Sequence, residues 1–241
     1  LDMIKTEKFI YEGDGKTYQG VLAFDDSHKE KRPAIMVSHT WMGQSQFEAD
    51  KAIALAEQGY LALAIDVYGK GKRAKDATEA EALMMEMQED RQELLNRLLL
   101  AMNSLKKHEL ADAANIAIIG FCFGGKCALD LARSGVAIKA SVCFHGIFDP
   151  PGLEQEEDIK AKILVLHGWE DPLAFPKDIA ALGYELTERN AIWEMDVFGH
   201  TGHAFTNPNA NAPDDGMMYN PLATDRSWLR MSNFFEEVFA N

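Results

Sequence analysis

The sequence contains few cysteines, few basic residues and no long apolar run, and each shortage excludes a class of protein. Only 3 of the 241 residues are cysteine, which is a poor disulfide framework and fits a reducing compartment. The 24 Lys and Arg are outnumbered by 38 Asp and Glu, for a net charge of −14. Nucleic acids and anionic membranes bind clustered basic residues, so neither is an expected partner.

Membrane insertion and secretion are not expected either. No stretch reaches the roughly 18 apolar residues that a membrane-spanning helix needs. Residues 1–10 alternate charged and apolar side chains and lack the apolar centre of a secretion signal. We therefore expect a cytoplasmic protein, and the sequence leaves open whether Leu1 and Asp2 belong to the natural chain.

The composition is that of a folded globular protein. Hydrophobic residues make up 47% of the chain and charged residues 26%, which argues against disorder. Domains hold about 100–200 residues, and α/β domains often exceed 200. Because no repeat, low-complexity stretch or linker interrupts the chain, we predict a single domain over residues 1–241.

Apolar runs alternate with helical patterns, which predicts an α/β fold with a mostly parallel central sheet and helices on both faces. The expected strands are 4–11, paired with 18–24, and then 34–38, 60–66, 115–120, 138–144, 162–167 and 192–198. The expected helices are 47–58, 77–108, 125–133, 177–190 and 223–240. Three methionines of the long helix, Met84, Met85 and Met87, are expected to fill the core. Ligand sites in such sheets lie beyond the carboxyl ends of the strands, so the segments that follow strands are the candidates for chemistry.

A glycine-flanked cysteine follows strand 115–120. Cys122 stands midway between Gly120 and Gly124, which is the nucleophile-elbow pattern G-x-C-x-G with Cys in place of Ser. The glycines permit a sharp strand-to-helix turn, and the helix N-terminus favours a thiolate. The backbone N–H of Phe123 is then a candidate oxyanion donor.

Two alternatives compete with this interpretation of Cys122. The cysteine could be buried and inert, as free cysteines often are. A dinucleotide-binding loop would instead need G-x-G-x-x-G after a first strand, which this segment does not match. The other two cysteines, Cys127 and Cys143, are expected in the core, and the spacing of Cys122 and Cys127 is not that of zinc ligands.

A candidate acid follows strand 162–167 in the segment HGWEDP. Asp171 is the predicted acid, and Pro172 forces an extended or turn conformation on it. Two alternatives stay open. Asp171 could serve only to hydrogen-bond the backbone of its own turn, or Glu170 could take its place as the orienting acid.

A candidate base follows strand 192–198 in the segment GHTGHAF. His203 is the predicted base and His200 its rival, which could be an ordinary loop residue. The His-x2-His spacing differs from the usual helical zinc motifs, so no metal is predicted.

Cys122, Asp171 and His203 follow one another in the chain order nucleophile, acid, base of α/β-hydrolases. Because each follows a predicted strand, all three can meet at one sheet edge. His203 would take the thiol proton or pair with the thiolate, and Asp171 would orient the imidazole. The thiolate would attack an ester carbonyl, and water would release the resulting thioester.

A second oxyanion donor is expected on the turn after strand 34–38. Trp41 is the first choice and Thr40 the next, while Trp41 could instead be ordinary apolar packing. His39 on the same turn is expected to be structural.

The segments GFCFGG, HGWEDP and GHTGHAF resemble those of the dienelactone hydrolase (carboxymethylenebutenolidase-like) family of the α/β-hydrolase superfamily. The resemblance covers residues 15–240. It implies a Cys-His-Asp triad, no cofactor, hydrolysis of small esters or lactones, and a monomer, with a weak dimer as the alternative.

The resemblance also implies three substrate-binding positions. Thr40 stands where the family carries a glutamate that helps to activate the thiol. Asn207 stands where an arginine follows the catalytic histidine, and Arg91 is a loose match for a second arginine. These departures argue against dienelactone as the substrate, but they do not argue against ester or lactone hydrolysis.

Two further functions remain as alternatives to a small-ester hydrolase. One is a broad carboxylesterase or thioesterase acting on another acyl group. The other is a non-catalytic binding module, since fold does not fix function. A complete nucleophile, acid and base argue against the binding module, because binding alone needs none of them.

Overall fold

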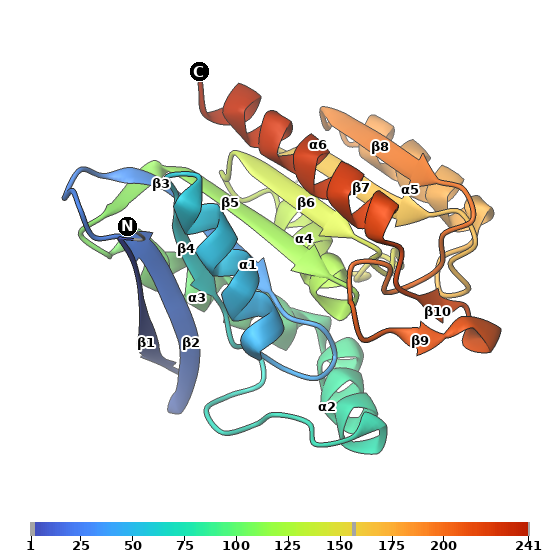
Figure 1. Ribbon diagram of the computed structural model, residues 1–241, viewed down its shortest axis with the longest axis horizontal. Coiled ribbons are helices and arrows are strands. Elements are labelled where there is room, and N and C mark those ends of the chain that lie inside the picture. Colours follow the sequence, from blue (N-terminus) through green and yellow to red (C-terminus); the bar gives the residue numbers. More distant parts are fainter. Residues whose placement is uncertain (1–2, 156–157, 241) are drawn as a thin grey trace. The chain divides into compact units, whose positions relative to one another are not determined.

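The computed structural model describes residues 3–155 and 158–240, in two compact units, Leu1–Ile119 and Gly120–Asn241 (Figure 1). Leu1 and Asp2, whose origin the sequence leaves open, lie outside the described residues. The single domain stays a prediction. No helix in residues 3–155 and 158–240 is both long and apolar enough to cross a membrane.

The first unit is a sheet with an antiparallel hairpin at one side. Its strands are β1 (Ile4–Gly13), β2 (Lys16–Asp25), β3 (Arg32–Ser38), β4 (Leu61–Ala64) and β5 (Ala111–Phe121), whose last two residues belong to the second unit. Their order is β1-β2-β4-β3-β5. The predicted pairing of the first two strands is confirmed, and Asp14 and Gly15 take the positive φ values of 50° and 73° that a two-residue hairpin needs. β3 and β4 are parallel.

Three helices accompany these strands: α1 (Gln46–Glu57), α2 (Ala77–Glu89) and α3 (Arg91–Lys106). In Figure 1, α1 lies in front of β3 and β4, and α3 lies behind them. Ser45 begins α1 with a capping box in which Glu48 reaches back to the Ser45 backbone.

The predicted single helix over 77–108 is wrong, because the chain breaks at Asp90. Asp90 has an extended φ of −130°, and its carboxylate accepts a hydrogen bond from the Glu93 backbone N–H at 3.0 Å. This is the geometry of a helix N-cap, so Asp90 ends α2 and begins α3. The signal, Asp three residues before Glu, is present in the sequence inside a strongly helical composition.

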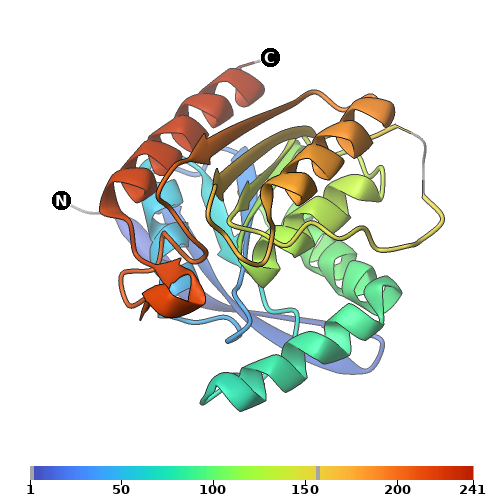
Figure 2. The ribbon, with the colours of Figure 1, turned by 90° about the vertical axis from the view of Figure 1, so that its right-hand side faces the viewer.

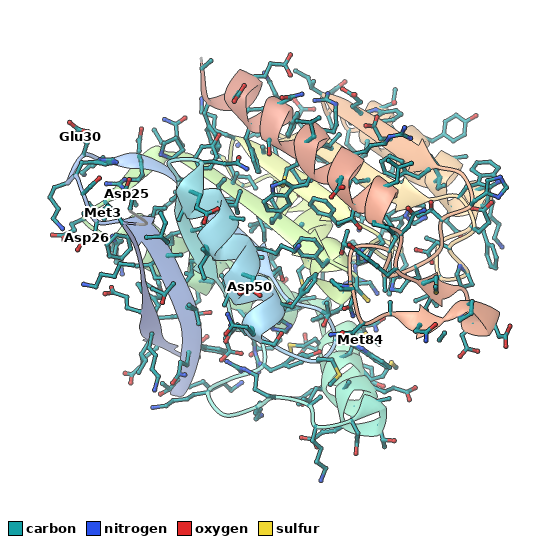
Figure 3. The ribbon with its side chains drawn as sticks, viewed as in Figure 1. Met3, Asp25, Asp26, Glu30, Asp50 and Met84 are labelled. Carbon is teal, nitrogen blue, oxygen red and sulfur yellow. The ribbon has the colours of Figure 1, made fainter. Side chains whose placement is uncertain are left out.

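The expectation that three methionines fill the core is confirmed only for Met87, which is buried. Met85 is 41% exposed, and Met84 is partly exposed on α2 (Figure 3). Met85 and Met87 are two positions apart and so lie on different sides of the helix, which leaves only one of them facing the core.

The second unit contains parallel strands between helices. Its strands are β6 (Ala140–Phe144), β7 (Lys162–Gly168) and β8 (Trp193–Phe198), and its helices are α4 (Phe123–Arg133), α5 (Pro176–Glu188) and α6 (Pro221–Phe239). β6–β7 and β7–β8 are parallel. α6 lies on one face of these strands, and α4 and α5 lie on the other (Figures 1 and 2). The α/β class predicted from the alternating pattern is confirmed.

A small hairpin between β8 and α6 was not predicted. It consists of β9 (Asn211–Ala212), a short 3-10 turn η1 (Pro213–Asp215) and β10 (Met217–Met218). Strands of two residues carry too little periodicity to be recognised in a sequence.

Buried ion pairs join α4 to its neighbours in the second unit. The Arg133 side chain is fully buried and donates to both carboxylate oxygens of Glu185 on α5, at 2.8 Å each. It also donates to the Phe148 carbonyl at 2.7 Å and lies 3.3 Å from the Asp130 carboxylate. This one guanidinium therefore links α4, α5 and the segment after β6.

Replacing Arg133 should destabilise the fold strongly, because it leaves the buried Asp130 and the partly buried Glu185 without their cation. We expect Arg133→Met to lower the free energy of unfolding by about 3–5 kcal/mol, measured by urea denaturation. The control is Arg230→Met, whose partner Glu194 is half exposed; there the loss should stay below about 1 kcal/mol. Equal losses in the two variants would contradict the assignment of a structural role to Arg133.

Candidate active site

The turn between β5 and α4 has the geometry of a nucleophile elbow. Cys122 takes φ 59° and ψ −118°, a strained conformation for a residue with a side chain. The strand and helix approach so closely that a Cβ on Gly120 would lie 1.8 Å from the Gly124 carbonyl oxygen. Glycine is therefore required there, and the cysteine is left partly exposed at the helix start.

His203 makes a hydrogen bond at each side of its ring. Its Nε2 lies 3.0 Å from the Cys122 sulfur, and its Nδ1 lies 2.8 Å from Oδ2 of Asp171. Asp171 is fully buried, and its other oxygen, Oδ1, accepts from the Leu173 backbone N–H at 2.8 Å. The carboxylate accepts from Nδ1, which leaves Nε2 directed at the sulfur.

The small hairpin after β8 holds the backbone of His203. The His203 N–H donates to the Gly216 carbonyl at 2.8 Å. A Cβ on Gly202 would lie 2.3 Å from that same oxygen, so glycine is needed immediately before the histidine. His203 itself is 2% exposed.

The two rival residues of the sequence analysis have other roles. Glu170 accepts from the Thr201 backbone N–H at 2.9 Å. This bond links the turn that holds Asp171 to the loop that holds His203. His200 is exposed and takes a left-handed φ of 54°, as a loop residue does. The carboxylate bonded to the His203 ring is therefore that of Asp171.

The charges around His203 favour its protonated form. Burial by itself would lower the pKa of His203, but the negative charges at the Cys122 sulfur and the Asp171 carboxylate outweigh it. Together they raise the pKa of His203 to about 10. With this pKa, His203 is protonated at neutral pH and lies between the Cys122 sulfur and the Asp171 carboxylate.

Comparison with known proteins decides the family. The model of the dienelactone hydrolase family matches residues 19–239. The chain belongs to the dienelactone hydrolase family.

Relatives within and near this family cover nearly the whole chain. The solved structure named m3DLH is 34% identical, covers 98% of this chain and 99% of its own, and has a TM-score of 0.93. A dienelactone hydrolase-like promiscuous phosphotriesterase from metagenomic libraries is 30% identical with the same coverage and a TM-score of 0.92. A protein of Aquifex aeolicus named "Putative carboxymethylenebutenolidase" is 28% identical over 94% of this chain and 96% of its own. These likenesses confirm the α/β-hydrolase fold.

The other two cysteines of this dienelactone hydrolase family member are buried, as predicted. Cys127 lies within α4 and Cys143 within β6, and both are 0% exposed. Burial raises the pKa of the Cys143 thiol to about 12, so it is protonated at neutral pH and inert as a nucleophile.

Phe123, the predicted oxyanion donor of the second unit, is the first residue of α4. Its N–H thus belongs to the first turn, where the partial positive charge of the helix favours an anion. Asn207, a predicted substrate-binding residue, uses its carboxamide oxygen within its own loop, accepting from the Asn209 N–H at 2.9 Å.

The remaining predicted site residues belong to the first unit. The Thr40 hydroxyl accepts from the Met42 N–H at 3.3 Å, the Trp41 carbonyl accepts from the Tyr68 hydroxyl at 2.8 Å, and Arg91 is buried at the start of α3. Their roles at the site stay predictions.

The structural role predicted for His39 is confirmed. Its Nε2 accepts from the Val67 N–H at 3.1 Å, and its Nδ1 donates to the Thr40 carbonyl at 2.7 Å. Burial lowers the pKa of His39 to about 4, which fits a neutral ring that accepts one bond and donates the other.

One residue beside His203 escaped the sequence analysis. His145 follows β6 directly, is 1% exposed, and has its ring centre 5.4 Å from that of His203. The rule that chemistry follows strand ends could have found it. The segment SVCFHG was instead treated only as an apolar strand.

The raised pKa of His203 leads to a measurable pH dependence. Its ring should stay protonated through pH 8 and lose its proton near pH 10. The titration can be monitored by the NMR signals of the imidazole. Cys122→Ala removes the negative sulfur and leaves Asp171 alone to oppose the effect of burial, so the pKa of His203 should fall. A midpoint near 6.5 in the unmodified protein would contradict the ion pair.

Proposed function

We propose that this protein is a thiol-dependent hydrolase of small esters or lactones in which Cys122, His203 and Asp171 form the catalytic triad. The observation that carries the proposal is the pair of contacts at His203, 3.0 Å to the sulfur and 2.8 Å to the carboxylate. Membership of the dienelactone hydrolase family supports ester or lactone hydrolysis as the reaction class.

The first half-reaction forms a thioester. The Cys122 thiolate attacks the carbonyl carbon, and the carbonyl oxygen takes up the negative charge of the tetrahedral intermediate. When the intermediate collapses, the C–O bond breaks and His203 gives its Nε2 proton to the departing alkoxide. In a lactone that alcohol stays attached to the acyl group by the opened ring.

The second half-reaction releases the acid. His203, now neutral, takes a proton from water as the water attacks the thioester carbonyl. Collapse expels the Cys122 thiolate and restores the imidazolium, so atoms and protons balance over the cycle. Asp171 keeps the proton on Nδ1 throughout and stabilises the positive ring.

The oxyanion would be held by backbone donors. The Phe123 N–H at the start of α4 is the first, and the Trp41 N–H, with Thr40 as the next choice, is the second predicted from the sequence. Thr40, Arg91 and Asn207 are the proposed substrate-binding positions.

The substrate class is supported by the relatives. The Aquifex aeolicus relative is named for the hydrolysis of a butenolide, a lactone, and a Bradyrhizobium relative 28% identical over 81% of this chain is named a probable lactonase. A broad carboxylesterase or thioesterase would use the same triad on another acyl group. A non-catalytic module would not need the bonded triad.

A second candidate activity is the hydrolysis of phosphotriesters. The relative that favours it is the metagenomic phosphotriesterase, similar over 98% of this chain with a TM-score of 0.92. The thiolate of Cys122 would then attack phosphorus in place of carbon, and His203 would again protonate the leaving oxygen. Water, giving a proton to His203, would next attack the phosphorus, break the S–P bond and restore the thiolate.

We also propose that the protein works as a cytoplasmic monomer built as a single domain. All three cysteines are free thiols, which is the expected state in a reducing compartment. The acidic composition disfavours nucleic acid and anionic membranes as partners, and a weak dimer remains the alternative state.

Removing the Cys122 thiol tests the triad. Cys122→Ala should lower kcat for an activated ester such as p-nitrophenyl acetate by about 10³-fold or more, because the nucleophile is lost. Cys127→Ala, the matched control in the helix that follows Cys122, should keep the kcat of the unmodified protein. Iodoacetamide should alkylate Cys122 faster than a free thiol at pH 7. Equal activity in the two variants, or no selective alkylation, would refute the proposal.

A panel of substrates separates the candidate activities. We expect five-membered lactones and short-chain esters to be hydrolysed with kcat/KM at least about tenfold above paraoxon, because the triad is that of acyl transfer. Paraoxon hydrolysis equal to or faster than ester hydrolysis, and abolished in Cys122→Ala, would make the phosphotriester the better substrate.

A further inference from the structure

A second histidine is packed against the ring of the proposed base. We propose that His145 is a positioning residue, which holds the His203 imidazole with Nε2 facing the Cys122 sulfur. This inference rests on the proposed function, because it assigns a task only if His203 is the base.

The backbone of His145 is unusual for a residue with a side chain. Its φ is +36°, in the left-handed region that favours glycine. The His145 N–H donates to the Leu166 carbonyl at 2.9 Å. The chain after it is packed so closely that a Cβ on Gly146 would lie 2.3 Å from the Cys143 sulfur, so glycine is needed there. Strained non-glycine residues of this kind cluster at functional sites.

The conformation delivers the imidazole into the interior beside the histidine loop. The His145 Nε2 lies 2.8 Å from the Thr206 hydroxyl, and Thr206 is itself 2% exposed. The ring also meets Phe205 edge-on, with the ring centres 5.0 Å apart at 75°. Bonded at its tip and packed along its edge, the His145 ring has a fixed orientation.

That fixed ring lies against the ring of His203. The ring centres are 5.4 Å apart and the planes meet at 72°, a favoured edge-to-face arrangement. The bond from Nδ1 to Asp171 leaves the His203 ring able to swing about this attachment. The His145 ring occupies space on one side of it and so limits that swing.

Limiting the swing matters because His203 acts twice in each cycle. It must present Nε2 first to the leaving oxygen and then to the attacking water, with the sulfur 3.0 Å away. A ring that turns away loses both proton transfers, while substrate binding does not depend on it. Loss of His145 should therefore appear in kcat and not in KM.

Three variants test this inference on the intact protein with p-nitrophenyl acetate. His145→Ala should lower kcat about 10- to 100-fold with KM changed less than about twofold. His145→Phe keeps a ring against His203, so its kcat should be at least about tenfold higher than that of His145→Ala. Thr206→Val removes only the bond at the ring tip and should give a smaller fall in kcat.

The controls separate positioning from folding. His200→Ala, which changes an exposed histidine of the loop before His203, should leave kcat unchanged. NMR signals of the His203 ring N–H groups should broaden or move in His145→Ala and return toward those of the unmodified protein in His145→Phe. If His145→Ala does not fold, as judged by its thermal unfolding curve, His145→Phe and Thr206→Val decide the matter.

Several outcomes would overturn the inference. Unchanged kcat in a folded His145→Ala, or a His145→Phe variant as impaired as His145→Ala, would show that no ring contact positions His203. A Cys122→Ala variant that keeps full activity would instead refute the proposed function. In that case the triad itself is wrong, and the role of His145, which depends on it, is wrong with it.

Discussion

His203 faces the Cys122 sulfur with one ring nitrogen and the Asp171 carboxylate with the other, and much of the second unit serves to keep these contacts. The histidine lies on a loop, and the elbow cysteine is strained, so neither would hold its geometry unaided. Backbone hydrogen bonds hold His203 and Asp171 in position instead. The Gly216 carbonyl fixes His203, and the Leu173 N–H fixes the acid from behind.

The surrounding charges extend this support. Lys126 on α4 is fully buried and lies 2.8 Å from the Asp149 carboxylate, and Arg133 on the same helix is bonded to Glu185 on α5. The helix that begins with the nucleophile turn is thereby tied to the segment after β6 and to α5. These pairs are costly to separate, because the fully buried Lys126 and Arg133 would each be left without a counter-charge in a medium of low polarity. A rigid helix start is what a strained nucleophile turn requires.

Local sequence patterns identify some residues of the site, and others are recognised only in the fold. G-x-C-x-G identifies Cys122 because only glycines permit so close an approach of strand and helix. The order of nucleophile, acid and base then suggests where the partners lie. The choice between Glu170 and Asp171, two neighbours of like chemistry, needs the fold: Glu170 turns to the Thr201 backbone, while Asp171 meets His203. His145 has no motif at all, since its contact with His203 joins residues 58 positions apart.

The sequence by itself determined the alternation of strands and helices, the elbow cysteine and the candidate acid and base, because these depend on hydrophobic period, glycine spacing and short-range turns. Tertiary structure decided the break at Asp90, where a cap within a helical composition ends one helix and starts another. It also decided which histidine faces the sulfur, which carboxylate bonds the other side of that ring, and how the ring is held. Those outcomes depend on which loops meet at the strand ends. A contact between distant loops produces no periodic pattern in the sequence.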